Sequence, residues 1–360
     1  MCARVWAPVF SDVSDPVLRV ALWSGVVATL LTVIVALVIV LLRLALLREE
    51  RRWQAFVAQW RPRLLSLVIE PSTAPLPALP AGERRRFLRL WVYLHESVRG
   101  EAAERLNNAA RSLGLDRFAR SLLAGGSRPA RLQAVLALGH LRDPAAWEAL
   151  HRLAGLRDPL LSINAARALV QIDPLRAAET LTPAVLQRDD WDVARLAAFM
   201  ADARDAFALM LARHLPGLRP SRLPRALRLA RALRANLPPP SLHRLLQQRT
   251  EPAVVCELLP LLHGPEWHDG VLQALQHPHA GVRAQALRAM ASIAVPADLP
   301  RLSALLQDAD ADVRLASAHV LVDLPFLGEP DLRALAAPGT PAHDALRHAI
   351  AQREWGGEAR

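Results

Sequence analysis

The fold is decided by a 32-residue stretch, residues 279–310, which reads HAGVRAQALRAMASIAVPADLPRLSALLQDAD. Small and apolar residues recur at helical spacing from Val282 to Met290, and a second amphipathic run follows Pro296. The pattern therefore predicts two helices joined by a short turn, and it restarts after Asp310 with Val313. Because so short a pair cannot bury both of its faces alone, it needs a similar pair on each side.

The same pattern recurs along most of the chain. It consists of an apolar residue at the first position, small residues at the fifth and eighth, and an apolar residue at the ninth. Successive copies begin 31, 32, 32, 28, 29, 31 and 29 residues apart, which indicates an array of two-helix units. The fits at the fourth and fifth copies are loose. The first positions are Ala130, Leu161, Val193, Arg225, Ala253, Val282, Val313 and Ala342.

Each position of the pattern has a physical role. The small residues allow a neighbouring helix to approach closely, while the apolar residues point into a shared core. Aspartates stand where helices are expected to begin, and an aspartate at this place accepts a hydrogen bond from an otherwise unpaired amide. The expected capping residues are Asp143, Asp158, Asp173, Asp190, Asp298 and Asp310. For Asp158, Asp190 and Asp310, an ion pair with the arginine a few residues further on is the alternative.

These features resemble HEAT repeats, in particular the short variety known from phycobilin-lyase-like proteins. The resemblance rests on Asp310-x-x-Val313-Arg314 and Val282-Arg283-x-x-Ala286, with weaker copies elsewhere, and it covers about residues 99–355. It implies an all-α protein, a right-handed α-solenoid of about eight units whose Val-Arg helices line the concave face. It implies no single function, because the same fold serves scaffolds, lyases, hydroxylases and glycosylases.

The composition agrees with closely packed helices. Hydrophobic residues make up 52% of the 360 residues and aromatic residues only 5%. The formal net charge is +10, and every basic residue is arginine. Such exclusive use of arginine is typical of a GC-rich, bacterial genome, so the positive charge alone does not indicate a nucleic-acid partner. Two distant cysteines, Cys2 and Cys256, suggest neither a disulfide framework nor a metal site.

Residues 20–42 are uncharged and apolar, and this length predicts one transmembrane helix. The alternative, a cleaved signal peptide, lacks a small-residue cleavage site after the apolar run. Arginines are concentrated on the C-terminal side of the span, which predicts a short extracytoplasmic N-terminus, residues 1–19, and a cytoplasmic remainder. The expected location is therefore the bacterial inner membrane.

The segment after the span, residues 43–70, is amphipathic. Trp53, Phe56 and Trp60 form one helical stripe beside Arg51 and Arg52. Two interpretations stay open. The stripe can lie at the membrane interface among anionic headgroups, or it can pack on protein as a continuation of the membrane helix. A proline-rich linker at residues 71–82, the solenoid at residues 83–355 and a tail at residues 356–360 are expected to follow.

The charge is unevenly distributed along the array. Residues 128–249 contain 19 Arg and 10 acidic residues, whereas residues 251–360 contain 8 Arg and 14 acidic residues. Arg225, Arg228 and Arg231 share one flank of a helix, and this basic strip is the candidate site for an acidic partner. The alternative interpretation is a solvated face in a chain that uses only arginine.

Motifs for catalysis are absent from the sequence: it contains no phosphate-binding glycine loop, no HExxH and no GxSxG. His263, His268, His277 and His279 lie near one turn, but they straddle two loops, so no metal and no cofactor are predicted. The membrane span and the acidic C-terminal third disfavour nucleic acid as a partner.

These features together predict a membrane-anchored cytoplasmic scaffold that binds one or more protein partners. A HEAT-like enzyme, either lyase-like or glycosylase-like, is the first alternative. A binder of anionic lipid or polyanion is the second. The sequence specifies neither the partner nor the oligomeric state.

Overall fold

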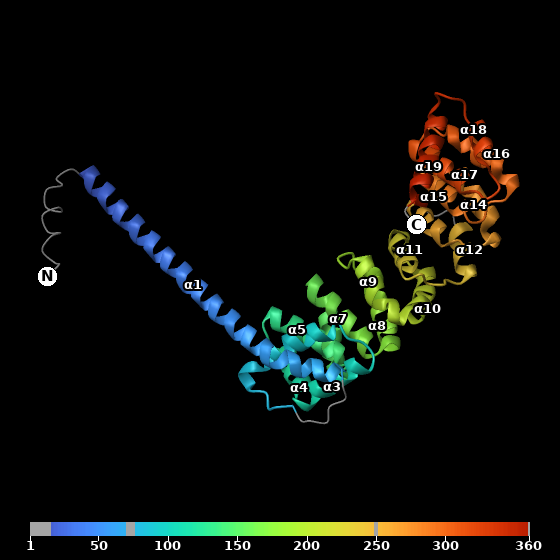
Figure 1. Ribbon diagram of the computed structural model, residues 1–360. Helices are drawn as coiled ribbons and strands as arrows, with labels where there is room; N and C mark the ends of the chain where they lie inside the picture. The colour runs from blue at the N-terminus through green and yellow to red at the C-terminus, as the bar shows by residue number, and fades with distance from the viewer. Residues whose placement is uncertain (1–15, 70–75, 248–250, 359–360) are drawn as a thin grey trace, which may run out of the picture. The chain divides into compact units, whose positions relative to one another are not determined.

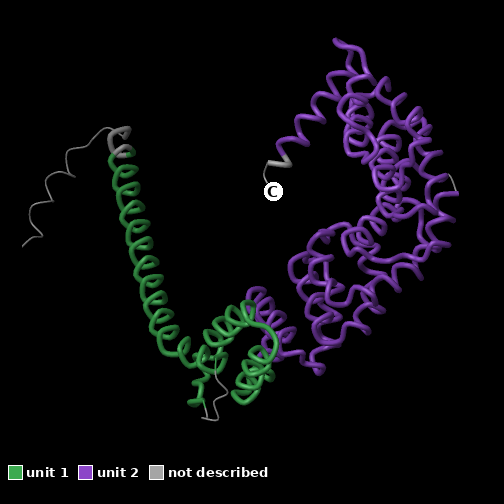
Figure 2. Tube along the Cα trace, turned by 45° about the vertical axis from the view of Figure 1, so that its right-hand side comes forward, with its two compact units in different colours: residues 1–118 green, residues 119–360 purple. Residues whose placement is uncertain are grey.

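The computed structural model describes residues 16–69, 76–247 and 251–358, and in these ranges it contains helices and no strand. The chain divides into two compact units, Met1–Phe118 and Ala119–Arg360 (Figure 2). The predicted all-α fold is therefore confirmed. Most of the predicted N-terminus at 1–19 and the first part of the linker at 71–82 lie outside the described residues.

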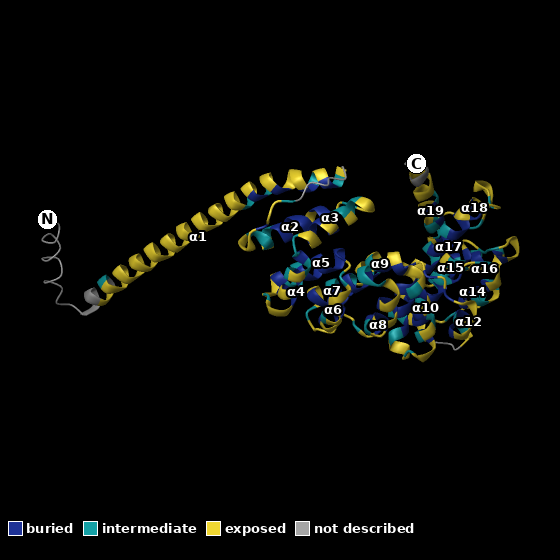
Figure 3. Ribbon diagram, turned by 90° about the horizontal axis from the view of Figure 1, so that it is seen from below, coloured by how far each residue is buried: buried dark blue, intermediate teal, exposed yellow. Residues whose placement is uncertain are grey.

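Unit 1 begins with one very long helix, α1 (Pro16–Ile69), which contains the whole predicted span (Figure 1). The apolar side chains between Val26 and Leu47 are exposed (Figure 3). Within the described part of the chain, α1 is the one helix long and apolar enough to cross a membrane. Its length and composition suit a span, and a signal sequence would satisfy the same criteria.

The C-terminal part of α1 packs on α2 (Arg84–His95) and α3 (Glu101–Ser112). Arg105 of α3 reinforces this contact by donating to the carbonyl oxygens of Leu67, at 2.9 Å, and Val68, at 2.8 Å. These carbonyls belong to the last turn of α1, where no intrahelical partner exists. The predicted solenoid at residues 83–355 includes α2 and α3, whereas the structure groups these helices with the end of α1.

The aromatic stripe of α1 lies inside this unit. Phe56 is 5% exposed and Trp60 is 1% exposed, and the Trp60 ring meets Phe87 edge-on at a centroid distance of 4.9 Å. Trp53 is only partly buried and lies under the guanidinium of Arg89. The burial of Phe56 and Trp60 favours packing on protein over a place at the membrane interface.

Unit 2 is a two-layered array of short helices, preceded by α4 (Leu115–Gly125), which spans the boundary between the units. Each expected first position falls in a helix of one layer, and each of these helices packs on the next. These helices are α5 (Arg128–His140), α7 (Pro159–Ile172), α9 (Val193–Met200), α11 (Leu223–Ala232), α13 (Pro252–Leu258), α15 (Ala280–Met290), α17 (Ala311–Asp323) and α19 (Pro341–Glu358).

A companion layer alternates with the first along the chain. Most of its helices pack on members of the first layer, whereas α8 and α10 pack mainly on each other, and the apolar faces meet in a shared core (Figures 1 and 3). The companions are α6 (Trp147–Ala154), α8 (Pro174–Gln187), α10 (Arg204–His214), α12 (Pro239–Gln247), α14 (His268–Ala274), α16 (Leu299–Ala304) and α18 (Glu329–Ala334).

The small residues of the pattern serve close helix contact, as expected. Ala165, Ala168 and Ala286 are at most 1% exposed. Gly139 is a clear example, because a Cβ on it would lie 2.9 Å from the Cα of Ala168 in α7. The approach of α5 to α7 therefore requires glycine at this position.

Four of the six expected aspartate caps form. Asp143, Asp158, Asp173 and Asp310 each accept a hydrogen bond from a backbone amide in the following turn. The other two expectations were wrong. Asp192, not Asp190, caps α9, since Asp190 pairs with Arg188 instead. Asp298 accepts from the amide of Val295, which lies before the helix.

Candidate functional site

The predicted basic strip lies on α11, but its three arginines have different surroundings. Arg225 is half-buried and donates from Nε to the carbonyl oxygen of Val185, at 3.1 Å, and from Nη2 to that of Trp191, at 2.7 Å. Its burial lowers the pKa of the Arg225 guanidinium below its ordinary value. Arg225 therefore fastens α11 to the preceding repeat and is not free to meet a ligand.

Arg228 and Arg231 are about half exposed and share one carboxylate of the next repeat. Arg228 Nε lies 3.1 Å from Glu257 Oε1, and Arg231 Nη1 lies 3.6 Å from Glu257 Oε2. The second distance is too long for a hydrogen bond, so Glu257 holds Arg231 loosely. Two cations facing one carboxylate leave an excess of positive charge on this flank of α11.

Arg234, which the predicted strip of three arginines leaves out, adds a third cation to this flank. It follows α11 in the left-handed region, with φ 50°, and it is exposed. The amide of Ala235 donates to the carbonyl oxygen of Ala230, at 2.8 Å, and so closes the end of the helix. Among the described residues, the Arg234 side chain has no hydrogen-bonding or ionic partner.

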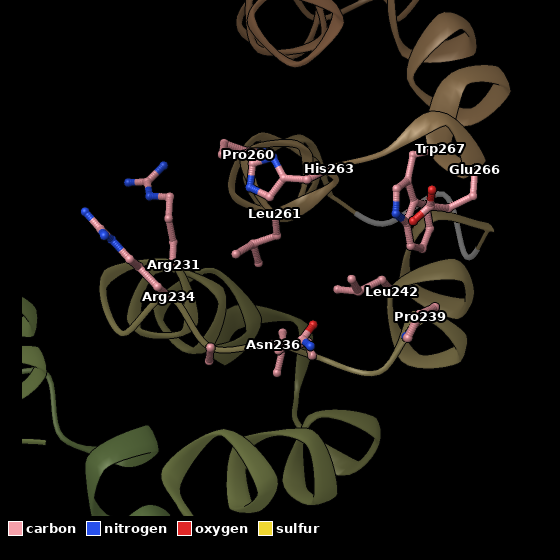
Figure 4. Close-up of a pocket in the computed structure, with 12 residues that line it drawn as sticks. Arg231, Arg234, Asn236, Pro239, Leu242, Pro260, Leu261, His263, Glu266 and Trp267 are labelled. Carbon is pink, nitrogen blue, oxygen red and sulfur yellow. The ribbon is translucent and has the colours of Figure 1, made fainter. Parts of the chain in front are cut away.

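A cavity of about 610 Å³ opens beside Arg231 and Arg234, and we call it the α11–α12 pocket. Figure 4 shows Arg231 and Arg234 on one side of it and Glu266 and Trp267 on the other. Apolar side chains lie between these two sides. The lining comprises Arg231, Arg234, Ala235, Asn236, Leu237, Pro239, Leu242, Pro260, Leu261, His263, Glu266 and Trp267.

The wall opposite the arginines is held in place by local structure. Trp267 is 3% exposed, and its ring lies over that of His243 of α12 with centroids 4.1 Å apart. Gly264, at φ 114°, starts the short 3-10 turn Pro265–Trp267. A Cβ on Gly264 would lie 2.4 Å from a carboxylate oxygen of Glu266, so this glycine also makes room for that carboxylate.

The four histidines that lie near this turn in the sequence have separate roles. His263 lines the α11–α12 pocket, whereas His268 Nε2 lies 2.8 Å from Oδ2 of the buried Asp298. His277 accepts a hydrogen bond from the amide of His279. Among the described residues, no group of three or more His, Cys, Asp or Glu side chains could hold a metal ion.

The hydrogen bond to Asp298, with a smaller contribution from Asp269, raises the pKa of His268 above its ordinary value of 6.5. Cys256 of α13 is partly buried, and burial raises the pKa of its thiol, with a smaller contribution from Glu257. A raised pKa disfavours the thiolate, which is the reactive form of cysteine.

Two other tryptophans of unit 2, Trp147 and Trp191, belong to the core, whereas Trp355 of α19 is 80% exposed. Trp191 is 1% exposed and donates from Nε1 to Ser162 Oγ at 2.9 Å. Trp147 is 4% exposed and lies under the guanidinium of Arg176. Neither therefore offers an open aromatic face to a ligand.

A family model described as HEAT repeats matches residues 115–201 and 240–353, which together are more than half of the chain. No curated protein matches the chain. Among solved structures, the chain is similar to an engineered protein from the Northeast Structural Genomics Consortium. That similarity has 17% identity and a TM-score of 0.34, and it covers 80% of this chain and 87% of that one.

The interval between the two matched regions, residues 202–239, contains the basic strip and the arginine side of the α11–α12 pocket. The loose fit of the repeat at Arg225 was the signal for this place in the sequence. Asn236, Leu242 and Leu261 gave no such signal, because single polar and apolar residues occur in every repeat. The two-layered array and the matched regions together show that the chain belongs to the HEAT-repeat family.

Proposed function

We propose that this protein is a membrane-anchored interaction scaffold. In this proposal α1 holds the chain in the bacterial inner membrane, and the solenoid lies in the cytoplasm. The solenoid binds one or more partner proteins, and it is a binding protein rather than an enzyme.

The observation that carries the proposal is the repeat array of unit 2. Its helices give one extended surface, and HEAT repeats commonly mediate contacts between proteins. A stable protein interface needs roughly 800 Å² on each partner, and a surface assembled from many repeats can supply it.

The anchoring rests on α1. Its apolar part is exposed over a length that suits a bilayer, and arginines follow it in the chain from Arg43 onward. Anchoring confines a scaffold to two dimensions and so raises the effective concentration of partners at the membrane.

The test is affinity purification of the full-length chain from detergent-solubilised membranes. We expect a partner protein in near-stoichiometric amount. Exchange of both Arg228 and Arg231 for Glu should reduce its recovery, because these side chains are exposed and carry excess charge. Arg225 must stay unchanged, since its loss would loosen the repeats themselves. Recovery of only lipid or nucleic acid would contradict the scaffold function.

A further inference from the structure

The α11–α12 pocket has the features of a binding site, and Arg231 is the one residue of the predicted basic strip that lines it. We propose that it receives an extended segment of a partner protein. An aliphatic or aromatic side chain of that segment enters the pocket, while a neighbouring Asp or Glu meets Arg231 and Arg234. This proposal rests on the scaffold function proposed above and specifies the chemistry of its partner.

The charge beside the pocket favours an acidic segment. Arg228, Arg231 and Arg234 follow one another along the end of α11, and Glu257 is the only carboxylate with which any of them forms an ion pair among the described residues. Arg234 is exposed and has no partner there. A carboxylate of a bound segment can approach Arg234 without displacing any existing contact.

Apolar surface lies between the charged sides. Leu242 and Leu261 contribute apolar side chains, and Pro239 and Pro260 add two rigid rings. Protein pockets that bind small groups typically enclose roughly 300–1,000 Å³, and this cavity, at about 610 Å³, falls in that range. When an apolar side chain displaces water from this surface, the free energy of binding becomes more favourable.

A polar group, Asn236, lies between the two sides of the pocket (Figure 4). Asn236 is exposed, and its amide can both donate and accept hydrogen bonds, as the backbone of an extended peptide requires. Glu266 on the opposite side disfavours a second acidic residue there, so the pocket also selects the direction of the segment (Figure 4).

The surroundings of Trp267 argue against a nucleic-acid base in the pocket. Its ring lies over that of His243 and is 3% exposed, so it offers no open face on which a base can stack. Phosphates alone would leave the apolar surface of the pocket exposed to water. A protein segment satisfies the cations and the apolar surface together.

The experiment uses the full-length protein in detergent micelles to select from a displayed library of random 12-residue peptides. We expect enrichment of peptides in which Asp or Glu stands next to Leu, Ile, Phe or Trp. In Arg234→Glu, the affinity for the best such peptide should fall by about tenfold. Selection on this variant should then favour Lys or Arg at the same place.

Arg213→Glu is the matched control, because Arg213 is an exposed arginine of α10 outside the pocket. It should leave the affinity within about twofold. If circular dichroism shows that Arg234→Glu does not fold, Arg234→Gln tests the loss of the charge alone. Leu261→Ser tests the apolar surface and should weaken the same peptide.

Acidic peptides that bind wild type and Arg234→Glu equally would overturn the pocket proposal and leave the scaffold function standing. Enrichment of basic peptides, or of none, by the wild-type protein would also overturn it. The purification from membranes then decides separately whether the protein is a scaffold.

Discussion

Four arginines at three-residue intervals, from Arg225 to Arg234, show how strongly the surroundings determine what a residue does. Arg225 donates to two backbone oxygens of the preceding repeat, Arg228 and Arg231 share Glu257, and Arg234 is unpaired within the described chain. The same guanidinium group is therefore structural at Arg225 and available for binding at Arg234.

Loss of the Arg225 side chain should destabilise the solenoid. Arg225→Ala leaves the carbonyl oxygens of Val185 and Trp191 without their donors, and we expect a cost of about 1–3 kcal/mol. Urea denaturation of the full-length chain measures it. Arg228→Ala, which changes a more exposed side chain, should cost no more than about 0.5–1 kcal/mol. Equal midpoints for the two variants would show that Arg225 does not fasten the repeats.

His268 and Asp298 should make stability depend on pH. The folded state raises the pKa of His268 above its ordinary value of 6.5 through Asp298 and Asp269, so protonation favours folding. This stabilisation is complete below about pH 6.5 and is lost as the pH rises through the raised pKa of the folded state. We therefore expect the urea midpoint to fall as the pH rises above about 6.5. In His268→Gln this fall should be smaller, and an unchanged pH profile would refute the assignment.

At the scale of elements, paired side chains connect successive repeats. Arg283 of α15 donates to both carboxylate oxygens of Asp308, at 2.8 and 2.7 Å, and also to the carbonyl oxygens of His277 and Pro278. Asp308 stands in the turn before α17, and the hydrogen bond from Arg283 lowers the pKa of its carboxyl group. An equivalent pair, Arg128 and Asp158, links α5 to the start of α7.

Arg283→Ala should therefore loosen α17 from α15. The change leaves the largely buried carboxylate of Asp308 without its cation, at a cost of about 2–3 kcal/mol. Relative to the wild type, amide hydrogen exchange should become faster in α17 and stay unchanged in the distant α7. The double variant Arg283→Ala/Asp308→Ala removes both charges and should recover part of the loss. If it is no more stable than Arg283→Ala, the unpaired Asp308 carboxylate is not the source of the cost.

The aromatic stripe of α1 gives a second prediction at this scale. Trp60→Ala opens a cavity against Phe87 and should cost about 3–5 kcal/mol, so trypsin should cleave more quickly after Arg84–Arg86. Trp60→Phe is the matched control. It keeps an aromatic ring and removes a buried N–H group that has no acceptor among the described residues. A role confined to the membrane interface would leave the cleavage rate of both variants unchanged.

At the scale of the whole molecule, the proposed orientation can be measured with thiol labelling. In Cys256→Ser, the remaining Cys2 precedes the proposed span. A membrane-impermeant maleimide should label it in spheroplasts without permeabilisation. A cysteine at the exposed position 307, introduced as Gln307→Cys in a chain without Cys2 and Cys256, should be labelled only after permeabilisation. The reverse labelling pattern would invert the orientation.

The sequence by itself determined the repeat and the order of its helices. Small and apolar residues return every 28–32 residues, and each of the eight expected first positions, from Ala130 to Ala342, falls in the expected layer. It could do so because residue size sets how closely helices pack, and residue size is known directly from the sequence. It also located the departure from the pattern at Arg225.

Only the tertiary structure decided which side chains are free to bind. The stripe from Trp53 to Trp60 suited a membrane interface or a protein core equally well until α2 and Phe87 were seen against it. The α11–α12 pocket is lined by Arg234, Leu242 and Glu266 from separate segments, and it exists only because these segments approach one another. Spacing along a helix gives the direction of a side chain, whereas its partners come from neighbouring repeats, and these contacts are set by packing.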